Sequence, residues 1–318
     1  MDRNIMKKVI KIHYNNPNIL KITFLLTTAC PYTCRYCPAE LHNGKNQHID
    51  LEQVAQLFDK FKHRQILLIL TGGEVTLHPQ FKDVVELAKQ MGVRVAVDTN
   101  SVRTVRFYKE VTDLVDVWNI TLHPSQHTFD IEKITVLTDK AYVVVYIMMD
   151  PLHWDLAVEW YTRVSKLDNV KIIPLRAVSN WGGAVCQVDY TPEQQIWLVD
   201  NPDLITITPA RRAELEQTHA YFANNTSTVT WNDNSSEILD PYMLIKINQN
   251  RFYGWNCSAG NENIFIQPDH SAGWATCGIK SYNHFNDIDP TELAESLTCN
   301  RLECNCVTDI RSTKSLVR

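Results

Sequence analysis

Residues 30–37 read Cys30-Pro31-Tyr32-Thr33-Cys34-Arg35-Tyr36-Cys37, and they directly follow an apolar run over residues 19–26 that is typical of a buried strand. A loop this short can direct three thiolates at one metal centre but cannot easily supply a fourth ligand. Three cysteine ligands leave one iron of a four-iron cluster open, whereas a structural metal site is usually closed by a fourth residue. The stretch therefore predicts an iron–sulfur site with an open position. A zinc or disulfide knot is the alternative.

The composition is that of an ordinary globular protein, with 318 residues, 44% hydrophobic and 21% charged. A formal net charge of -5 gives no general attraction to nucleic acid or to an anionic membrane. No apolar run approaches the roughly 20 residues that span a bilayer, and the N-terminus lacks the apolar stretch of a signal peptide. Nine cysteines in a chain without an export signal favour metal or redox work. We predict a cytoplasmic protein of one large domain or two.

Strand-like and helix-like segments alternate up to residue 178. The predicted strands cover residues 19–26, 65–70, 93–97, 117–122, 142–149 and 170–178. Amphipathic helices are predicted between them, over residues 51–61, 81–91, 104–114, 130–138 and 157–167. This alternation indicates an α/β fold with a parallel sheet and right-handed crossovers, with too few units for an eight-stranded barrel. A short edge strand is expected over residues 9–13.

Two motifs resemble the radical S-adenosylmethionine (radical SAM) superfamily. The first is the C-x3-C-x2-C spacing with an aromatic residue, Tyr36, before the third cysteine. The second is Gly72-Gly73-Glu74, which is similar to the GGE motif of that family and follows the second predicted strand. The resemblance implies an open (β/α)6 partial barrel over about residues 19–178. It also implies a [4Fe-4S] cluster on Cys30, Cys34 and Cys37 whose open iron is chelated by SAM and whose electron cleaves SAM to a 5'-deoxyadenosyl radical.

The resemblance further implies that Tyr36, Gly72, Gly73 and Glu74 belong to the cofactor site, with the GGE segment receiving the amino group of SAM. Glycine is needed where a chain passes close to a ligand without a Cβ in the way. Residues 75–79 read Val-Thr-Leu-His-Pro and keep all but the first residue of the Pro-Thr-Leu-His-Pro that commonly follows this motif. His78 is then expected to orient the loop.

Other polar residues fall at the ends of predicted strands, where functional residues of such folds gather. Asn100 and His123 could face the ribose of SAM or the substrate, or could satisfy local backbone groups. Arg176 could pair with a carboxylate of SAM or substrate, or form a surface salt bridge. Cys186, beside Gly182-Gly183, could donate a hydrogen atom to a radical or could be an ordinary buried cysteine. His123 and Cys186 are therefore the catalytic candidates.

The alternation breaks after residue 180. We predict four parts: a lead-in over residues 1–18, the barrel core over 19–180, a helical and linker region over 181–240, and a cysteine-rich module over 241–318. Within the third part, helices are expected from Thr191-Pro192 and over residues 209–222, and a polar linker or flexible loop over 223–240. Within the fourth, a hairpin over residues 263–276 should bring Cys257 and Cys277 to one site. A short helix over 290–297 should precede the last cysteines.

The last part resembles the twitch module, the shortened form of the SPASM extension, which holds one auxiliary [4Fe-4S] cluster. Its five cysteines compete for four ligand positions; they are Cys257, Cys277, Cys299, Cys304 and Cys306. The spacing of Cys304 and Cys306 is tighter than the C-x2-C often found in that module, so the spare thiol among the last three stays open. A four-cysteine zinc site is the alternative. Trp231, Trp255 and Trp274 are expected to pack around the module.

These patterns favour a radical SAM oxidoreductase or maturase-type enzyme that abstracts hydrogen from a substrate C–H bond. The auxiliary cluster would accept an electron or anchor the substrate. The outcome would be oxidation, cross-linking or epimerisation of a peptide or small molecule, with flavodoxin or ferredoxin as the type of reductant. Residues 1–18 are too short for a leader-binding domain, which disfavours a peptide.

Two alternatives stay open. One is a non-catalytic iron–sulfur or zinc protein, such as an electron carrier or sensor, which would not require the GGE motif. The other is a radical SAM enzyme that modifies nucleotides or nucleic acid, although the chain has no basic run that would support nucleic-acid binding.

Overall fold

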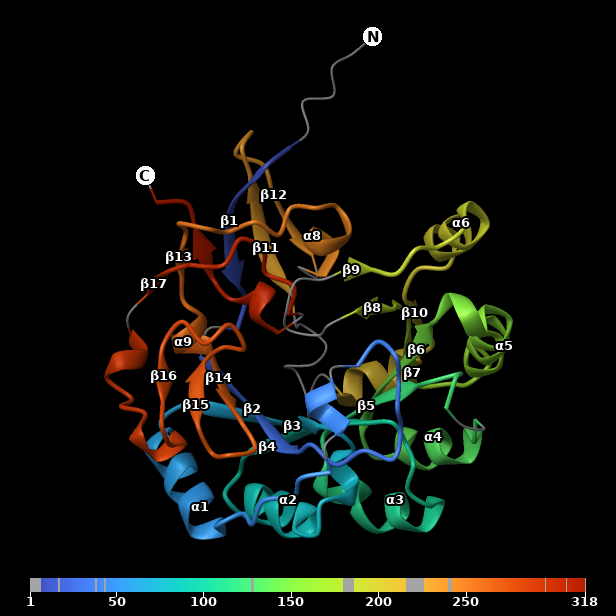
Figure 1. Cartoon of the computed structure of the whole chain (residues 1–318), viewed down its shortest axis with the longest axis horizontal. Helices are drawn as coiled ribbons and strands as arrows, with labels where there is room; N and C mark the ends of the chain where they lie inside the picture. The colour runs from blue at the N-terminus through green and yellow to red at the C-terminus, as the bar shows by residue number, and fades with distance from the viewer. Residues whose placement is uncertain are drawn as a thin grey trace. The chain divides into compact units, whose positions relative to one another are not determined.

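The computed structural model describes residues 7–16, 18–37, 39–42, 44–126, 129–179, 186–215, 226–239, 242–294, 296–306 and 308–317 (Figure 1). The chain divides into two compact units. The barrel unit comprises Phe24–Phe58 and Leu67–Ala223. The cysteine-rich unit comprises Met1–Thr23, Asp59–Ile66 and Asn224–Arg318. The division cuts through strands β2 (Ile19–Thr27) and β3 (Gln65–Gly72).

The barrel unit is built on a largely parallel sheet, which confirms the predicted α/β fold. Its remaining strands are β4 (Arg94–Thr99), β5 (Val117–Leu122), β6 (Tyr142–Met149), β7 (Val170–Arg176) and β10 (Leu204–Ile205). The strand order is β10-β7-β6-β5-β4-β3-β2. Strands β3 to β7 pair in parallel, and β10 adds an antiparallel edge. All six predicted strands are present, so a partial barrel is the architecture.

The helices follow the predicted alternation. They are α1 (Leu51–Lys60), α2 (Phe81–Gln90), α3 (Val105–Val111), α4 (Ile131–Thr138) and α5 (Trp154–Val164). Figure 1 shows α2 to α5 along the outer side of the strands. Side-chain caps fix where some of them begin: Thr104 accepts a hydrogen bond from the Phe107 amide, and Asp130 accepts one from the Glu132 amide. Because β3 to β7 run parallel, their C-terminal ends all lie at the same end of the sheet.

Beyond β7 the elements are short. β8 (Val178–Ser179) and β9 (Cys186–Gln187) form an antiparallel pair. The predicted helix after Thr191 is α6 (Pro192–Asp200), which begins with a complete capping box between Thr191 and Gln194. Residues 209–215 are helical, and the rest of the helix predicted over 209–222 lies outside the described residues.

The cysteine-rich unit contains a six-stranded sheet in the order β12-β11-β1-β18-β13-β17. Its strands are β1 (Val9–Tyr14), β11 (Ser227–Trp231), β12 (Ser236–Leu239), β13 (Asn256–Cys257), β17 (Leu297–Thr298) and β18 (Lys314–Ser315). The predicted hairpin is present as β14 (Asn263–Ile266) and β15 (Ala272–Trp274), followed by β16 (Ser281–Tyr282). The unit also contains the short helical segments α8 (Tyr242–Lys246), α9 (Ala259–Glu262) and η7 (Asp309–Arg311).

Three local predictions are wrong in this unit. β1 is not an edge strand, because it pairs with β11 on one side and β18 on the other. Residues 227–239 are not a linker but a hairpin: alternate residues Val229 and Trp231 are buried, and Asn234 adopts a φ of 64° beside the turn. The helix predicted over 290–297 is one 3-10 turn, η6 (Glu292–Ala294), because Leu297 joins the β-ladder opposite Cys257.

In the ranges that the structure describes, every helix is too short or too polar to cross a membrane.

Candidate active site and second cysteine cluster

The first three cysteines lie in a tight turn directly after β2. The Cys37 amide donates to the Cys34 carbonyl at 3.0 Å, and the Tyr32 amide donates to Cys30 Sγ at 3.4 Å. None of the three thiols is in a disulfide. Burial raises the pKa of Cys30, and that of Cys34 to about 11. Thiolates therefore form here readily only when a metal compensates their charge.

His123, at the end of β5, contacts this loop. Its Nδ1 lies 2.7 Å from the Tyr36 hydroxyl and 3.6 Å from Cys34 Sγ. The imidazole stacks on the Tyr36 ring with 5.9 Å between centroids. The structure thus places His123 where it orients the loop, and a direct catalytic role for it stays a prediction.

Asn100, at the end of β4, also reaches the loop. Its amide nitrogen donates to Cys30 Sγ at 3.6 Å, and its side-chain oxygen accepts from the Val102 amide at 3.1 Å. One half of the side chain is therefore satisfied by local backbone, and the other half touches a predicted cluster ligand.

The GGE segment is docked on the backbone that leads into the cysteine loop. The Gly73 amide donates to the Thr27 carbonyl at 2.8 Å, and the Glu74 amide donates to the Ala29 carbonyl at 2.7 Å. Gly72 has a φ of 143°, and a Cβ there would lie 2.1 Å from the Thr27 oxygen; a Cβ on Gly73 would lie 2.3 Å from the Ala29 oxygen. The close approach that requires these glycines is to the chain's own backbone. The two motifs are consequently one structural piece.

The Glu74 side chain is fully buried and engaged inside the protein. One carboxylate oxygen accepts from Thr76 and from the Thr99 hydroxyl at 2.7 Å, and the other accepts from the Asn100 amide at 2.7 Å. Burial raises the pKa of Glu74, against the effect of these donors. The carboxylate therefore links the GGE segment to the end of β4. Its direct contact with SAM stays a prediction.

His78 has the structural role expected of it. Its Nδ1 accepts from the Gln80 amide at 3.1 Å, and its Nε2 lies 3.0 Å from the Gln47 carbonyl. The ring thereby ties the residues after the GGE segment to the loop before α1.

Sequence reasoning missed an ion pair that holds the cysteine loop. The Arg35 guanidinium donates to both oxygens of Asp150, at 2.5 and 3.4 Å. The Asp150 side chain is fully buried at the end of β6. Burial opposes its ionisation, but hydrogen bonds from Arg35, the Leu152 amide and His153 hold the pKa of Asp150 below its usual value. Its place at the C-terminal end of a predicted strand was the available signal.

A second missed group is a polar row across three strands. Asp98 on β4 accepts from the side-chain amide Nδ2 of Asn119 on β5 at 2.8 Å and from the Thr71 side chain on β3. Burial raises the pKa of Asp98, although both hydrogen bonds oppose the shift. Alternate residues of a strand share one face, so Asp98 lies on the face of Asn100, and Asn119 on that of His123. The row is thus about 7 Å or more along the strands from the residues that touch the cysteine loop.

The remaining strand-end candidates are placed differently. The Arg176 guanidinium lies over the Tyr190 ring, 5.3 Å from its centroid, and Arg176 has no ion pair within the described ranges. The Tyr190 hydroxyl in turn donates to the Met149 carbonyl at 2.8 Å. Cys186 is in β9, but its side chain lies outside the described residues. The carboxylate-binding and hydrogen-donor roles stay predictions.

The cysteine-rich unit gathers four of its five thiols in one apolar cluster. Cys257 and Cys299 are buried members of it, and Cys277 and Cys304 pack against it. Backbone bonds fix the spacing, since the Cys299 amide donates to the Trp255 carbonyl at 2.7 Å and the Cys304 amide to the Asn250 carbonyl at 2.9 Å. The predicted packing tryptophans are buried, two of them in the same cluster: Trp231, Trp255 and Trp274.

Cys306 stands apart from that apolar cluster. Its thiol interacts with the Thr276 side chain, and burial raises its pKa to about 11. Burial likewise raises the pKa of Cys277 to about 12. Cys257, Cys277, Cys299 and Cys304 therefore share an apolar cluster that does not include Cys306, and which four thiols bind a metal stays a prediction.

The donor chemistry of both cysteine groups fits iron–sulfur clusters. Within the described ranges, no three His, Cys, Asp or Glu side chains converge on one metal ion. Soft thiolate ligands suit iron–sulfur clusters and zinc alike, so the four-cysteine zinc site stays an alternative for the second group.

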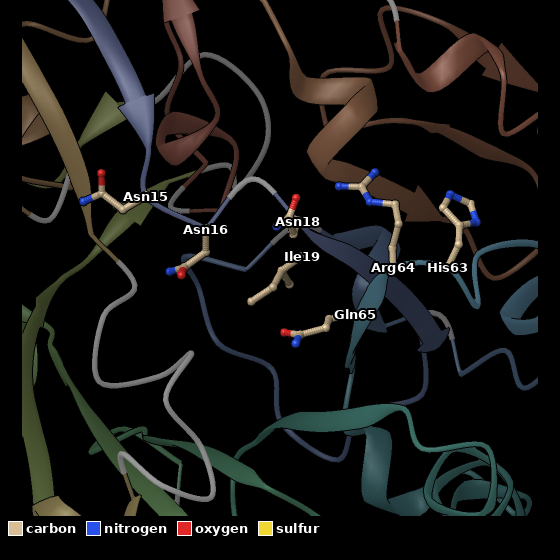
Figure 2. Close-up of a pocket in the computed structure, with 7 residues that line it drawn as sticks. All are labelled: Asn15, Asn16, Asn18, Ile19, His63, Arg64 and Gln65. Carbon is tan, nitrogen blue, oxygen red and sulfur yellow. The ribbon is translucent and has the colours of Figure 1, made fainter.

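The cavity in Figure 2 is a separate feature of the cysteine-rich unit, with a volume of about 550 Å³. It lies beside the starts of β2 and β3, and its lining contains none of the predicted cluster ligands. Arg64, one of the lining residues, donates to the Asn261 carbonyl at 2.5 Å. The cavity is therefore not part of the sites described above.

Comparison with known proteins finds similarity to one family within the barrel unit. The family model of the Radical SAM superfamily matches residues 24–148. A segment is 32% identical over 109 residues to the S-adenosylmethionine-dependent nucleotide dehydratase of Pseudoalteromonas ulvae, covering 29% of this chain and 35% of that protein. Another is 33% identical over 109 residues to the probable GTP 3',8-cyclase of Sulfolobus acidocaldarius, covering 33% and 34%. The matches span about a third of the length of these relatives.

A solved structure supports the same fold over most of the chain. The structure of native anSMEcpe with bound AdoMet aligns with a TM-score of 0.53 at 11% identity. The alignment covers 87% of this chain and 80% of that one.

Proposed function

Because the chain carries a radical SAM superfamily domain at residues 24–148, we propose that it is an enzyme that reductively cleaves SAM and abstracts hydrogen from a substrate C–H bond. The observation that carries this proposal is the docking of Gly73 and Glu74 on the carbonyls of Thr27 and Ala29. It joins the segment proposed to hold SAM to the loop proposed to hold the cluster. A non-catalytic iron–sulfur protein has no need for that junction.

In this proposal Cys30, Cys34 and Cys37 hold a four-iron cluster with one open iron. When bound, the cluster supplies the electron that splits SAM into methionine and a 5'-deoxyadenosyl radical. The residues around the cysteine loop hold it and orient its thiols. Asn100 and His123 hold Cys30 and Cys34, each at 3.6 Å, and Arg35 fixes the loop to Asp150. Rigid placement of this kind lets the reacting atoms meet without further ordering.

The GGE segment would present its backbone carbonyls to the ammonium group of SAM. Glu74 fixes the conformation of that segment, because its carboxylate accepts hydrogen bonds from Thr99 and Asn100 at the end of the neighbouring strand. A negative charge beside the ammonium also favours binding.

The four packed thiols Cys257, Cys277, Cys299 and Cys304 would hold an auxiliary four-iron cluster. With four thiolate ligands, that cluster has no open iron for SAM. Its proposed task follows hydrogen abstraction, when the substrate radical gives up an electron and a proton. The substrate would lose one hydrogen atom to the 5'-deoxyadenosyl radical, one electron to the auxiliary cluster and one proton to solvent, a two-electron oxidation. For turnover, the auxiliary cluster would pass its electron to an external acceptor, and the external reductant would resupply the first cluster.

The polar row of Thr71, Asp98 and Asn119 is the proposed contact for the substrate. A carboxylate whose described partners are a neutral amide and a hydroxyl can still accept from a cationic or N–H-rich group. A small molecule with such a donor is the substrate class that this row supports.

A nucleotide substrate is the second candidate. Two relatives carry names that specify nucleotide chemistry, and the Asp98–Asn119 pair could accept from and donate to the edge of a base. Isothermal titration calorimetry compares GTP binding by the reconstituted wild-type protein and by Asp98→Asn. It distinguishes a nucleotide substrate from another small molecule. Binding that is lost in the variant supports the nucleotide, and no binding by either protein contradicts it.

The main proposal is tested by electron paramagnetic resonance of the anaerobically reconstituted, reduced protein. Addition of SAM should change the cluster signal in the wild-type chain, because SAM occupies the open iron. In Cys34→Ala the SAM-sensitive signal should be missing. An unchanged wild-type signal at saturating SAM contradicts the proposal.

A further inference from the structure

A buried lysine lies directly beside the second group of thiols. Lys314 on β18 is opposite Cys257 on β13 in the antiparallel register. Residues directly opposite in such a pair have Cβ atoms about 4.5–5.5 Å apart and project to the same face. Lys314 is 2% exposed, and Cys257 belongs to the apolar cluster that gathers four cysteines. Lysine is rarely buried this fully unless something nearby stabilises its charge.

The hydrogen bonds of this ammonium are unusual for a buried charge. All its described acceptors are backbone carbonyls, those of Asp309 at 2.5 Å, Ser312 at 3.1 Å and Ile310 at 3.4 Å. These carbonyls belong to η7 and the residue after it, so they fix the position of the ammonium. Backbone dipoles stabilise a cation but do not cancel its charge. Within the described residues the Lys314 ammonium is therefore held by backbone carbonyls and lies over the Phe252 ring, 5.5 Å from its centroid, with no carboxylate bonded to it.

The nearby carboxylates are engaged by neutral donors. Asp309 accepts from the Thr276 amide at 2.9 Å and from the Thr276 hydroxyl, and Glu262 accepts from the Thr313 amide at 3.0 Å. The other cations of this region are Lys21 and Arg311. Among the described residues, neither carboxylate forms an ion pair with Lys314.

We propose that Lys314 is a fixed positive charge that raises the reduction potential of the cluster held by Cys257, Cys277, Cys299 and Cys304. This inference rests on the auxiliary cluster of the proposed function and specifies the direction of electron transfer, from the substrate radical to that cluster. Net charge and burial are among the factors that set the potential of an iron–sulfur cluster. A buried cation stabilises the more negative, reduced form, because screening by water is weak there. The cluster is then suited to accept an electron from a substrate radical.

The test is a redox titration of the full-length, reconstituted protein, followed by electron paramagnetic resonance of both clusters. Lys314→Gln removes the charge but keeps a donor for the carbonyls, and Lys314→Met removes both. Lys62→Gln is the control, since Lys62 is exposed in the same unit and loses the same charge. We expect a more negative midpoint for the auxiliary signal in Lys314→Gln than in the wild-type chain or in Lys62→Gln. The SAM-sensitive signal should keep its midpoint.

The outcomes separate this inference from the function beneath it. About eight irons per chain with an unchanged auxiliary midpoint in Lys314→Gln overturns the role of Lys314 and leaves the two-cluster proposal standing. About four irons in the wild-type chain, with one signal, overturns both. Loss of auxiliary iron in Lys314→Gln makes Lys314 a structural residue and overturns its electrostatic role. If Lys314→Met fails to fold, Lys314→Gln alone decides the question.

Discussion

Arg35, inside the cysteine loop, forms a two-bond ion pair with the buried carboxylate of Asp150, with Nη2 to Oδ1 at 2.5 Å and Nε to Oδ2 at 3.4 Å. The loop after β2 is thereby fastened to the end of β6. Three thiols can face one cluster only if the backbone that carries them is fixed in place. The Arg35–Asp150 ion pair fixes this backbone without involving the thiols themselves.

Arg35→Leu should destabilise the protein by about 1–3 kcal/mol, because it leaves the buried Asp150 carboxylate short of a donor. Arg106→Leu is the matched control, since Arg106 pairs with Glu110 on an exposed helix face. Its cost should be much smaller, because exposed ion pairs contribute little to stability. Urea denaturation of the two variants without metal measures both values. Equal, small losses would show that the Arg35–Asp150 pair does not hold the loop.

The same pair predicts a pH dependence with a definite sign. The pKa of Asp150 is lowered in the folded chain, so the pair stabilises the protein above the unfolded pKa of about 3.9. That stability is lost as the pH falls through the lower, folded pKa. The difference in unfolding free energy between wild type and Arg35→Leu should therefore shrink below about pH 4. A difference that grows on acidification would contradict the assignment.

Glu74→Ala should weaken SAM binding about tenfold or more, which corresponds to the loss of at least 1.4 kcal/mol. The variant removes the acceptor of Thr99 and Asn100 and a negative charge near the proposed ammonium site. Equilibrium dialysis of reconstituted protein with labelled SAM gives the affinities, with exposed Glu86→Ala as control. If the wild-type chain binds SAM no better than Glu74→Ala, the role of the GGE segment is wrong.

Cys306→Ala should keep about eight irons per chain, whereas Cys277→Ala should lose about four. We expect this difference because the other four thiols of the unit, Cys277 among them, pack in one apolar cluster that does not include Cys306. Cys277→Ala should still form some 5'-deoxyadenosine, because the barrel cluster is intact, but should not make the normal product. Iron, sulfide and nucleoside are quantified on the same samples. Loss of auxiliary iron from Cys306→Ala would show that the ligand set is wrong.

Much of the barrel could be predicted because its signals are local. The apolar runs of β2 to β7 and the spacing of the first three cysteines each lie within ten residues. The partners of those residues could not be predicted, since they come from distant strands. Asp150 is 115 positions from Arg35, and Asn100 is 26 from Glu74.

The cysteine-rich unit was less predictable because its strands are short and polar. The hairpin of β11 and β12 depends on pairing with β1, more than 200 positions away. Without that partner, the Asn, Asp and Ser residues at 232–236 favour a loop. Likewise, no local pattern distinguishes Cys306 from Cys304. Only their packing in the folded chain separates them.

The central claim is that this chain cleaves SAM reductively, and the most direct measurement is the 5'-deoxyadenosine formed by the reconstituted protein. The assay is anaerobic, with excess SAM and dithionite, and nucleosides are separated by liquid chromatography and mass spectrometry. We predict 5'-deoxyadenosine from the wild-type chain and none above background from Cys34→Ala. A wild-type chain that carries at least about four irons, binds SAM and yet forms no 5'-deoxyadenosine would contradict the account.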